Sequence, residues 1–215
     1  MGYVEKTVRA GRTIETLRYY CHRVHPKGCK RQKKQKKTKE SQHKINVRNA
    51  TDKLRWLLNE NFGVGDVHMV LNYRREYTRT PEEAKKDLER FMRGMRKWCR
   101  GQGKELRYVT VTEYKRARIH HHLVVPEIPA KDLYILWPYG RPHETPLDDT
   151  GDYRKLAEYL LKEKQRTAQS EDRHKKRWNQ SRNLRPPRIE YETVQARSWR
   201  KDPKPLKGYY IDKEV

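Results

Sequence analysis

The sequence predicts an α+β fold: a ferredoxin-like or RRM-like antiparallel sheet with helices packed on it and basic extensions at both ends. In the middle of the chain, segments with strand and helix patterns follow one another as strand, helix, strand, strand, helix, strand, which is the split βαβ order. Only 33% of the 215 residues are hydrophobic, so we expect one core in the middle of the chain. We therefore expect a basic arm over residues 1–48, a folded domain over 49–165 and a basic extension over 166–215.

The charge of the chain favours a polyanionic partner. Lys and Arg number 52 against 28 Asp and Glu, a formal net charge of +24, which is typical of proteins that bind nucleic acid or an anionic surface. The cationic run over residues 30–39 cannot bury a core and fits a phosphate-binding arm with little base preference. No apolar stretch is long enough to span a membrane. Three irregularly spaced cysteines favour a reducing cytoplasm.

The first two elements of the predicted domain are a helix over residues 50–60 and a strand over 66–73. The helix has leucines at positions i, i+3 and i+4, which form a single face: Leu54, Leu57 and Leu58. Two glycines separate it from the strand. Alternate residues of the strand are apolar and share one face: Val67, Met69 and Leu71.

A second helix is expected from Pro81 to about Arg100. Thr80 can cap its first turn, and Glu83 stands three residues after the cap, which is the spacing of a capping box. Proline is favoured at the first helical position. The apolar residues that follow share one face, which we interpret as core: Ala84, Leu88, Phe91, Met95 and Trp98.

A β-hairpin with strands at 106–114 and 119–125 carries three consecutive histidines in its second strand. Side chains alternate along a strand, so His120 and His122 share one face and His121 points to the other. Two imidazoles one strand repeat apart can bind one divalent metal ion. A pair of this kind is also often a plain surface feature.

The register of this hairpin decides which residue completes the site. An even-numbered turn pairs Glu113 with His120, so that Glu113, His120 and His122 form a three-ligand set. A three-residue loop would place Tyr114 there instead. The turn contains neither Gly nor Asn to fix its type, so both registers stay open, with Glu113 preferred.

Three more elements complete the predicted domain: a short helix over 130–136, a strand near 143–147 and a helix over 152–164. In a split βαβ topology the first and third strands lie at the centre of the sheet. The histidine strand would therefore lie beside the strand at 66–73. The last helix can then fold across the histidine face.

Tyr159 and Lys162 lie one turn apart on that last helix, so the phenol and the ammonium can reach one site. A protonated phenol, with an ordinary pKa of about 10, is a weak nucleophile and needs a nearby cation or an activated phosphate. Lys162 can stabilise the phenolate or bind the phosphate. Tyr153 lies about 120° away around the helix, so we interpret Tyr159 as the single nucleophile. The pair is also common by chance on amphipathic helices.

After about residue 165 the chain becomes basic again. Residues 173–178 mix cations with an aromatic side chain and can extend a DNA groove. The alternative is a tail packed back on the domain, because Trp178, Leu184 and Trp199 favour burial.

Together these motifs resemble those of rolling-circle replication initiators of the HUH endonuclease superfamily, phage and plasmid type. Three segments match the family motifs in order, namely a hydrophobic strand after a Gly/Asp turn, a His-hydrophobic-His metal strand and a Tyr-x-x-Lys helix: residues 65–73, 118–125 and 158–162. The resemblance covers roughly residues 50–187. It departs from the family pattern at His121, a position that is usually apolar, and at Asn72, where the first motif often has Thr.

The resemblance implies a metal-dependent DNA nickase that starts replication in a prokaryotic host cell. Tyr159 would attack a phosphate of single-stranded or hairpin origin DNA, assisted by Lys162. The products would be a 5′-phosphotyrosine and a free 3′-OH primer. His120, His122 and Glu113 would hold Mn²⁺ or Mg²⁺, and two imidazoles favour Mn²⁺.

Phosphate binding and base stacking are expected from four cations and one indole: Arg116, Arg118, Lys155, Arg177 and Trp178. The sequence has no Walker A motif, so a host helicase and polymerase are expected partners. A single-tyrosine HUH transposase or relaxase would use the same chemistry. A non-catalytic nucleic-acid-binding protein on the same sheet would instead carry aromatics on the central strands, where this chain has His120 and His122.

Overall fold

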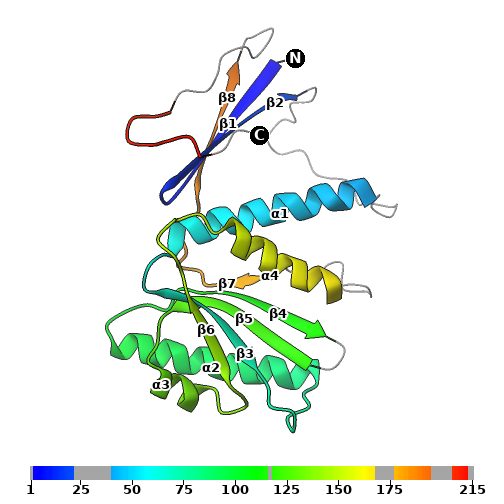
Figure 1. Cartoon of the computed structure of the whole chain (residues 1–215), viewed down its shortest axis with the longest axis vertical. Coiled ribbons are helices and arrows are strands. Elements are labelled where there is room, and N and C mark those ends of the chain that lie inside the picture. The colour runs from blue at the N-terminus through cyan, green and yellow to red at the C-terminus, as the bar shows by residue number, and fades with distance from the viewer. Residues whose placement is uncertain (1, 22–39, 116–117, 168–176, 195–204, 213–215) are drawn as a thin grey trace. The chain divides into compact units, whose positions relative to one another are not determined.

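The computed structural model describes residues 2–21, 40–115, 118–167, 177–194 and 205–212 (Figure 1). The contacts divide the chain into two compact units. The larger unit comprises residues 8–15 and 33–188, and the smaller unit comprises residues 1–7, 16–32 and 189–215.

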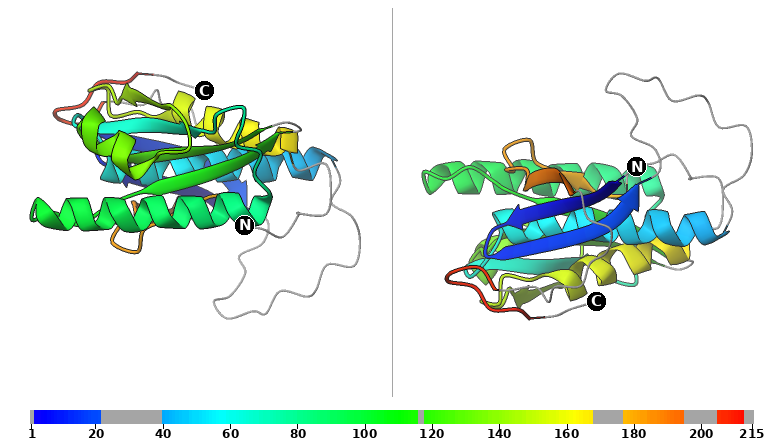
Figure 2. Two further views of the ribbon diagram at one scale, coloured as in Figure 1. Left: turned by 90° about the horizontal axis from the view of Figure 1, so that it is seen from below. Right: turned by 90° about the horizontal axis from the view of Figure 1, so that it is seen from above.

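The larger unit contains a five-stranded antiparallel sheet in the order β6-β3-β5-β4-β7, so the fold is α+β. Its strands are β3 Asp66–Asn72, β4 Val109–Lys115, β5 Arg118–Pro126, β6 Pro142–Pro146 and β7 Asn179–Gln180. Its helices are α1 Glu40–Asn61, α2 Pro81–Gly101, α3 Ala130–Leu136 and α4 Arg154–Thr167. Helices α1 and α4 lie on one face of the sheet, and α2 and α3 lie on the other (Figure 1; two further views in Figure 2). None of the described helices is both long and apolar enough to cross a membrane.

The predicted elements from residue 66 to residue 167 are all present, and β3 lies beside β5 as expected of the first and third strands. Two differences concern the edges of this unit. Helix α1 begins at Glu40, well before the predicted start. Its first turns are polar and carry no apolar stripe, so the hydrophobic pattern does not indicate them. Strand β7 is only two residues long, too short to show alternation in the sequence.

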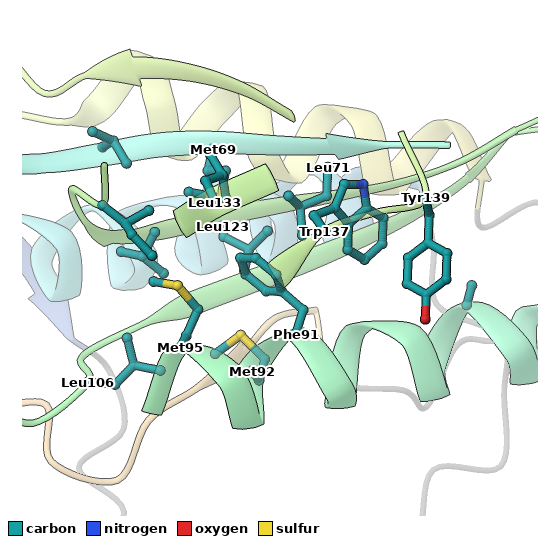
Figure 3. Close-up of a cluster of buried hydrophobic side chains, with 14 of the residues drawn as sticks. Met69, Leu71, Phe91, Met92, Met95, Leu106, Leu123, Leu133, Trp137 and Tyr139 are labelled. Atoms are coloured by element: carbon teal, nitrogen blue, oxygen red, sulfur yellow. The ribbon is translucent and has the colours of Figure 1, made fainter. Parts of the chain in front are cut away.

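One core lies between the sheet and α2. The predicted helix cap is confirmed: Thr80 accepts a hydrogen bond from the Glu83 backbone, and the Glu83 side chain accepts one from the Thr80 backbone. The predicted faces of α2 and β3 meet in this core (Figure 3). Its largest buried side chains include Trp137, Phe91 and Met95. This core holds β3 and β5 in place from the α2 side of the sheet. The candidate site lies on the opposite face.

A second core lies between the other face of the sheet and helices α1 and α4. Leu54 and Leu58 of α1 meet Leu160 and Leu161 of α4 over the valines of β4 and β5. Trp178 and Leu184 pack against this core as partly buried side chains. Part of the predicted basic extension therefore packs back on the domain, whereas Trp199 lies outside the described residues.

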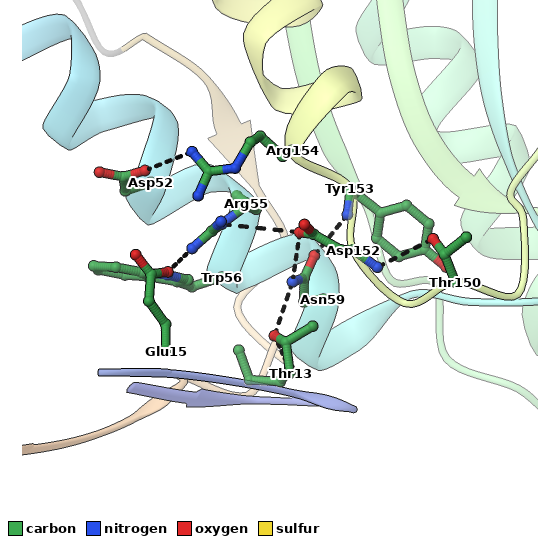
Figure 4. A network of polar contacts seen from close by, with 11 residues as sticks. Thr13, Glu15, Asp52, Arg55, Trp56, Asn59, Thr150, Asp152, Tyr153 and Arg154 are labelled. Carbon is green, nitrogen blue, oxygen red and sulfur yellow. Dashed lines mark hydrogen bonds and ion pairs between the residues drawn. The ribbon is translucent and has the colours of Figure 1, made fainter. Parts of the chain in front are cut away.

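Asn59 of α1 joins the tip of the N-terminal hairpin to the residues just before α4 (Figure 4). The Asn59 amide donates to Thr13 Oγ1 at 3.0 Å and to Asp152 Oδ1 at 3.2 Å. The side-chain oxygen Oδ1 of Asn59 accepts a hydrogen bond from the Tyr153 backbone N–H at 2.9 Å. A Cβ on Gly11 would lie 2.0 Å from the backbone carbonyl oxygen of Asn59, so only glycine fits this turn. The Asn59 side chain therefore ties Asp152 and Tyr153, which precede α4, to α1.

The smaller unit contains most of a three-stranded sheet in the order β2-β1-β8. Its strands are β1 Gly2–Ala10, β2 Thr13–Cys21 and β8 Arg188–Val194. An ion pair of 2.7 Å joins Arg18 and Glu5 across the hairpin, and the Tyr3 and Tyr20 rings meet edge to face. Residues 2–21, which fall within the predicted basic arm over 1–48, thus form a hairpin, and cross-strand pairs can stabilise a hairpin without a deep core. The cationic run at 30–39 lies outside the described residues.

Candidate functional site

The hairpin of β4 and β5 has the register that places a carboxylate beside the histidines. Lys115 pairs with Arg118, which leaves a two-residue turn, and Glu113 therefore pairs with His120. Val111 pairs with His122. The even-numbered turn is confirmed, and the alternative that would have brought Tyr114 into the site is excluded.

Glu113 and His122 form a buried pair on the face of the sheet that α4 covers. Oε2 of Glu113 lies 3.6 Å from Nε2 of His122, and the two side chains are only 2% and 3% exposed. Burying a carboxylate is costly unless a partner compensates it. At 3.6 Å the carboxylate and the imidazole are close but not hydrogen-bonded to each other, and the pair presents an oxygen and a nitrogen donor close together.

His68 on β3 joins this pair, and its only signal in the sequence is its place opposite the apolar face of its strand. Its Nε2 lies 3.4 Å from His122 Nδ1, and the two rings stack with centroids 5.6 Å apart. Burial lowers the pKa of His68 to about 4, helped by the neighbouring His122 and His143. The His68 imidazole is therefore neutral near pH 7.

Asn72, also on β3, contacts the other histidine of the predicted pair. Its Oδ1 forms a hydrogen bond with Nδ1 of His120, and the two residues are cross-strand partners. Such a bond places the proton on Nδ1 and the lone pair on Nε2, which is how ligating histidines are usually oriented. Asn72 therefore orients the His120 ring through this bond.

His121 points to the opposite face of β5 and is not part of the site. It is fully buried in the core, with Nδ1 3.0 Å from Thr112 Oγ1 and Nε2 3.3 Å from the Tyr73 hydroxyl. Burial lowers its pKa to about 3. Of the three consecutive histidines, His120 and His122 therefore share the site face, as alternation predicts.

Tyr159 of α4 faces the histidine cluster. Its ring lies edge-on to His122 and His68, with centroids 5.5 Å and 5.8 Å away, and the side chain is 44% exposed. The rival Tyr153 is buried in the core, with its hydroxyl bonded to the Asp148 carbonyl at 3.0 Å. Lys162 is exposed one turn after Tyr159. The described contacts bring Tyr159, but not Lys162, against the histidines.

The side chains of Glu113, His120 and His122 are only partly placed to hold one divalent metal ion. Among the described residues, no three His, Cys, Asp or Glu side chains are already grouped to hold one. Donors bonded at about 2.1 Å to one ion stand about 3 to 3.6 Å apart, so the Glu113–His122 separation fits two of them. His120 lies on the same face one strand repeat away.

The predicted DNA-binding residues come from several elements of the larger unit. Arg118 and Lys155 are exposed at the start of β5 and on α4. Arg177 and Trp178 are half-buried beside α1. Arg116 lies outside the described residues.

Residues 66–164 match the family model described as Replication-associated protein ORF2/G2P. The match begins at β3 and ends within α4, so it contains every residue of the histidine cluster and Tyr159. No curated protein and no solved structure matches the chain.

Proposed function

We propose that this protein initiates rolling-circle replication by nicking single-stranded origin DNA, a role that the match of residues 66–164 to the replication-associated protein ORF2/G2P family model supports. The proposed enzyme is a metal-dependent HUH nickase with Tyr159 as its nucleophile. The strand order β6-β3-β5-β4 supports a ferredoxin-like sheet of the HUH kind.

The observation that carries the proposal is the contact of one half-exposed tyrosine with two imidazoles next to a buried carboxylate. Tyr159 combines solvent access with rings of His122 and His68 at 5.5 Å and 5.8 Å. A nucleophile must be reachable by its substrate and lie beside the groups that activate it. A pure binding module has no need to bury Glu113 against His122 beneath an exposed phenol.

In the proposed reaction the hydroxyl oxygen of Tyr159 attacks the phosphorus of one phosphodiester. The P–O3′ bond breaks, the phosphate becomes linked to the tyrosine, and the phenol proton is released. The departing 3′ oxygen takes up a proton and becomes the 3′-OH that primes synthesis. The ammonium of Lys162, one helical turn away, stabilises negative charge on the phenol oxygen or the phosphate.

His122, Glu113 and His120 would hold Mn²⁺ or Mg²⁺, which would neutralise charge on the phosphate oxygens. Asn72 would keep the proton of His120 on Nδ1, so that Nε2 serves as the ligand. Single-stranded or hairpin origin DNA is the substrate in this proposal, and a host helicase and polymerase extend the primer. An HUH transposase or relaxase would use the same residues.

The test is a cleavage assay on a labelled pool of single-stranded DNA from the encoding element, with Mn²⁺ or with EDTA. The proposal expects a protein-linked DNA band in Mn²⁺ and none in EDTA. Tight, salt-sensitive binding without any adduct in Mn²⁺ or Mg²⁺ would favour the alternative of a non-catalytic nucleic-acid-binding protein.

A further inference from the structure

A polar groove of about 660 Å³ lies between the first half of α1 and the segment that contains β7. Its volume is within the range of sites that hold a small ligand, about 300–1,000 Å³. Four of the residues that line it carry carboxamide side chains: Asn46, Asn49, Asn179 and Gln180. The remaining walls come from an indole, two cations and one alanine. Nucleobases are recognised by this combination of amides, an aromatic face and positive charge.

The residues of α1 that line the groove are spaced like a stripe that faces a core, but most of them are polar. Asn46, Asn49, Ala50 and Lys53 stand at positions i, i+3, i+4 and i+7, which share one helix face. Such a stripe is usually apolar because it packs against a core. Here three of the four side chains are polar and exposed. This face of α1 is therefore suited to a polar ligand.

The opposite wall is held in place by hydrogen bonds and by packing. Trp178 is half-buried against the core of α1 and α4, and its Nε1 donates to Gln180 Oε1 at 2.8 Å. That bond fixes both the indole and the Gln180 amide. Arg177 donates to the Asn46 carbonyl at 3.0 Å, which ties this segment to α1. The wall is thus ordered before any ligand arrives.

The groove lies near the candidate catalytic residues along one strand. Asn179 pairs with Thr110 of β4, and Glu113 follows three residues later on that strand. At about 3.3 Å per residue the separation along β4 is roughly 10 Å. A few nucleotides of single-stranded DNA span that distance.

We propose that this groove binds a base of single-stranded DNA near the nick, stacked on Trp178 and read by the amides of Asn49 and Gln180. Amide side chains pair in a bidentate manner with adenine, whose edge offers one donor and one acceptor. Adenine is therefore the expected base. The inference rests on the proposed function, because it gives the DNA substrate of that same enzyme a sequence preference.

The experiment measures fluorescence anisotropy of labelled oligo(dA), oligo(dT) and oligo(dC) with the full-length Tyr159→Phe protein in EDTA, where no cleavage interferes. Asn49→Ala and Trp178→Ala are compared with Gln102→Ala, which removes an exposed amide at the end of α2. We expect the parent protein to prefer oligo(dA). Asn49→Ala should abolish that preference with little change in oligo(dT) binding, and Gln102→Ala should change neither.

Trp178→Ala should weaken binding of all three oligonucleotides by about 5- to 100-fold, as expected for loss of one stacked base. Since Trp178 is half-buried, Trp178→Phe serves as the folded companion and should retain most of the affinity. Equal affinity for the three oligonucleotides in the parent, or an adenine preference that survives Asn49→Ala, would overturn the inference. If adenine preference is present and cleavage is absent in the wild type, the groove stands and the nickase proposal fails. If the wild type cleaves DNA and the variants bind as the parent does, the nickase proposal stands and the groove inference fails.

Discussion

The carboxylate of Glu113 lies 3.6 Å from Nε2 of His122, in a part of the sheet where both side chains are almost fully buried. The two residues come from neighbouring strands, and their proximity depends on the two-residue turn that sets the register of β4 and β5. On the proposed mechanism this pair is the fixed part of the metal site.

Replacement of Glu113 by Gln tests this pair at nearly constant volume. We expect a loss of DNA cleavage of at least about 100-fold, because removing a stabilising charge from a catalytic site typically costs that much. Single-turnover cleavage at graded Mn²⁺ concentrations measures the effect, with Glu127→Gln, an exposed carboxylate after β5, as the matched control. Cleavage at the wild-type rate would remove Glu113 from the site.

Asn72 is expected to act through His120. Asn72→Ala removes the acceptor for His120 Nδ1 and should weaken Mn²⁺ binding by about 10- to 100-fold, as is typical when the partner of a ligating histidine is lost. Asn72→Asp keeps an acceptor and should retain most of the affinity. Mn²⁺ titration by calorimetry distinguishes the two variants, and equal loss in both would indicate a merely structural role.

Asn59 should matter for stability, since one side chain bonds the hairpin tip, Asp152 and the backbone of Tyr153. Asn59→Ala leaves the buried Tyr153 amide without this acceptor, so a loss of about 1–3 kcal/mol in the free energy of unfolding is expected. Urea denaturation measures it. Asn49→Ala, on an exposed part of the same helix, should change the free energy of unfolding by less than about 0.5 kcal/mol.

A substitution in the capping box of α2 should lower the free energy of unfolding without affecting the proposed catalytic residues. Thr80→Ala removes the hydroxyl that accepts from the Glu83 backbone and should cost about 1 kcal/mol of unfolding free energy. DNA cleavage per folded molecule should stay unchanged, because α2 lies on the opposite face of the sheet from α4 (Figure 1), the helix that carries Tyr159. A fall in specific cleavage with unchanged stability would contradict this separation.

Much of the site follows from strand alternation alone. The turn parity that brings Glu113 opposite His120 stayed open in the sequence, whereas alternation places His120 and His122 on one face of the strand and His121 on the other. The helix phase likewise separates Tyr159 from Tyr153. These are local rules with a fixed period, so a single sequence suffices to apply them.

His68 and the N-terminal hairpin could not be predicted in the same way. A lone histidine in a strand has no partner in its own segment, and its contact with His122 depends on which strands are neighbours. The stabilising pairs of the β1–β2 hairpin form across strands rather than along the sequence. Strand β7 is defined only by its pairing with β4.

The central claim is that Tyr159 is the nucleophile, and the most direct measurement compares covalent DNA adducts of the wild type, Tyr159→Phe and Tyr153→Phe in Mn²⁺, with the linked peptide located by mass spectrometry. We expect the adduct on the peptide that contains Tyr159, its complete loss in Tyr159→Phe at unchanged melting temperature, and its retention in Tyr153→Phe, which loses only the hydrogen bond to the Asp148 carbonyl. An adduct that persists in Tyr159→Phe would contradict the account.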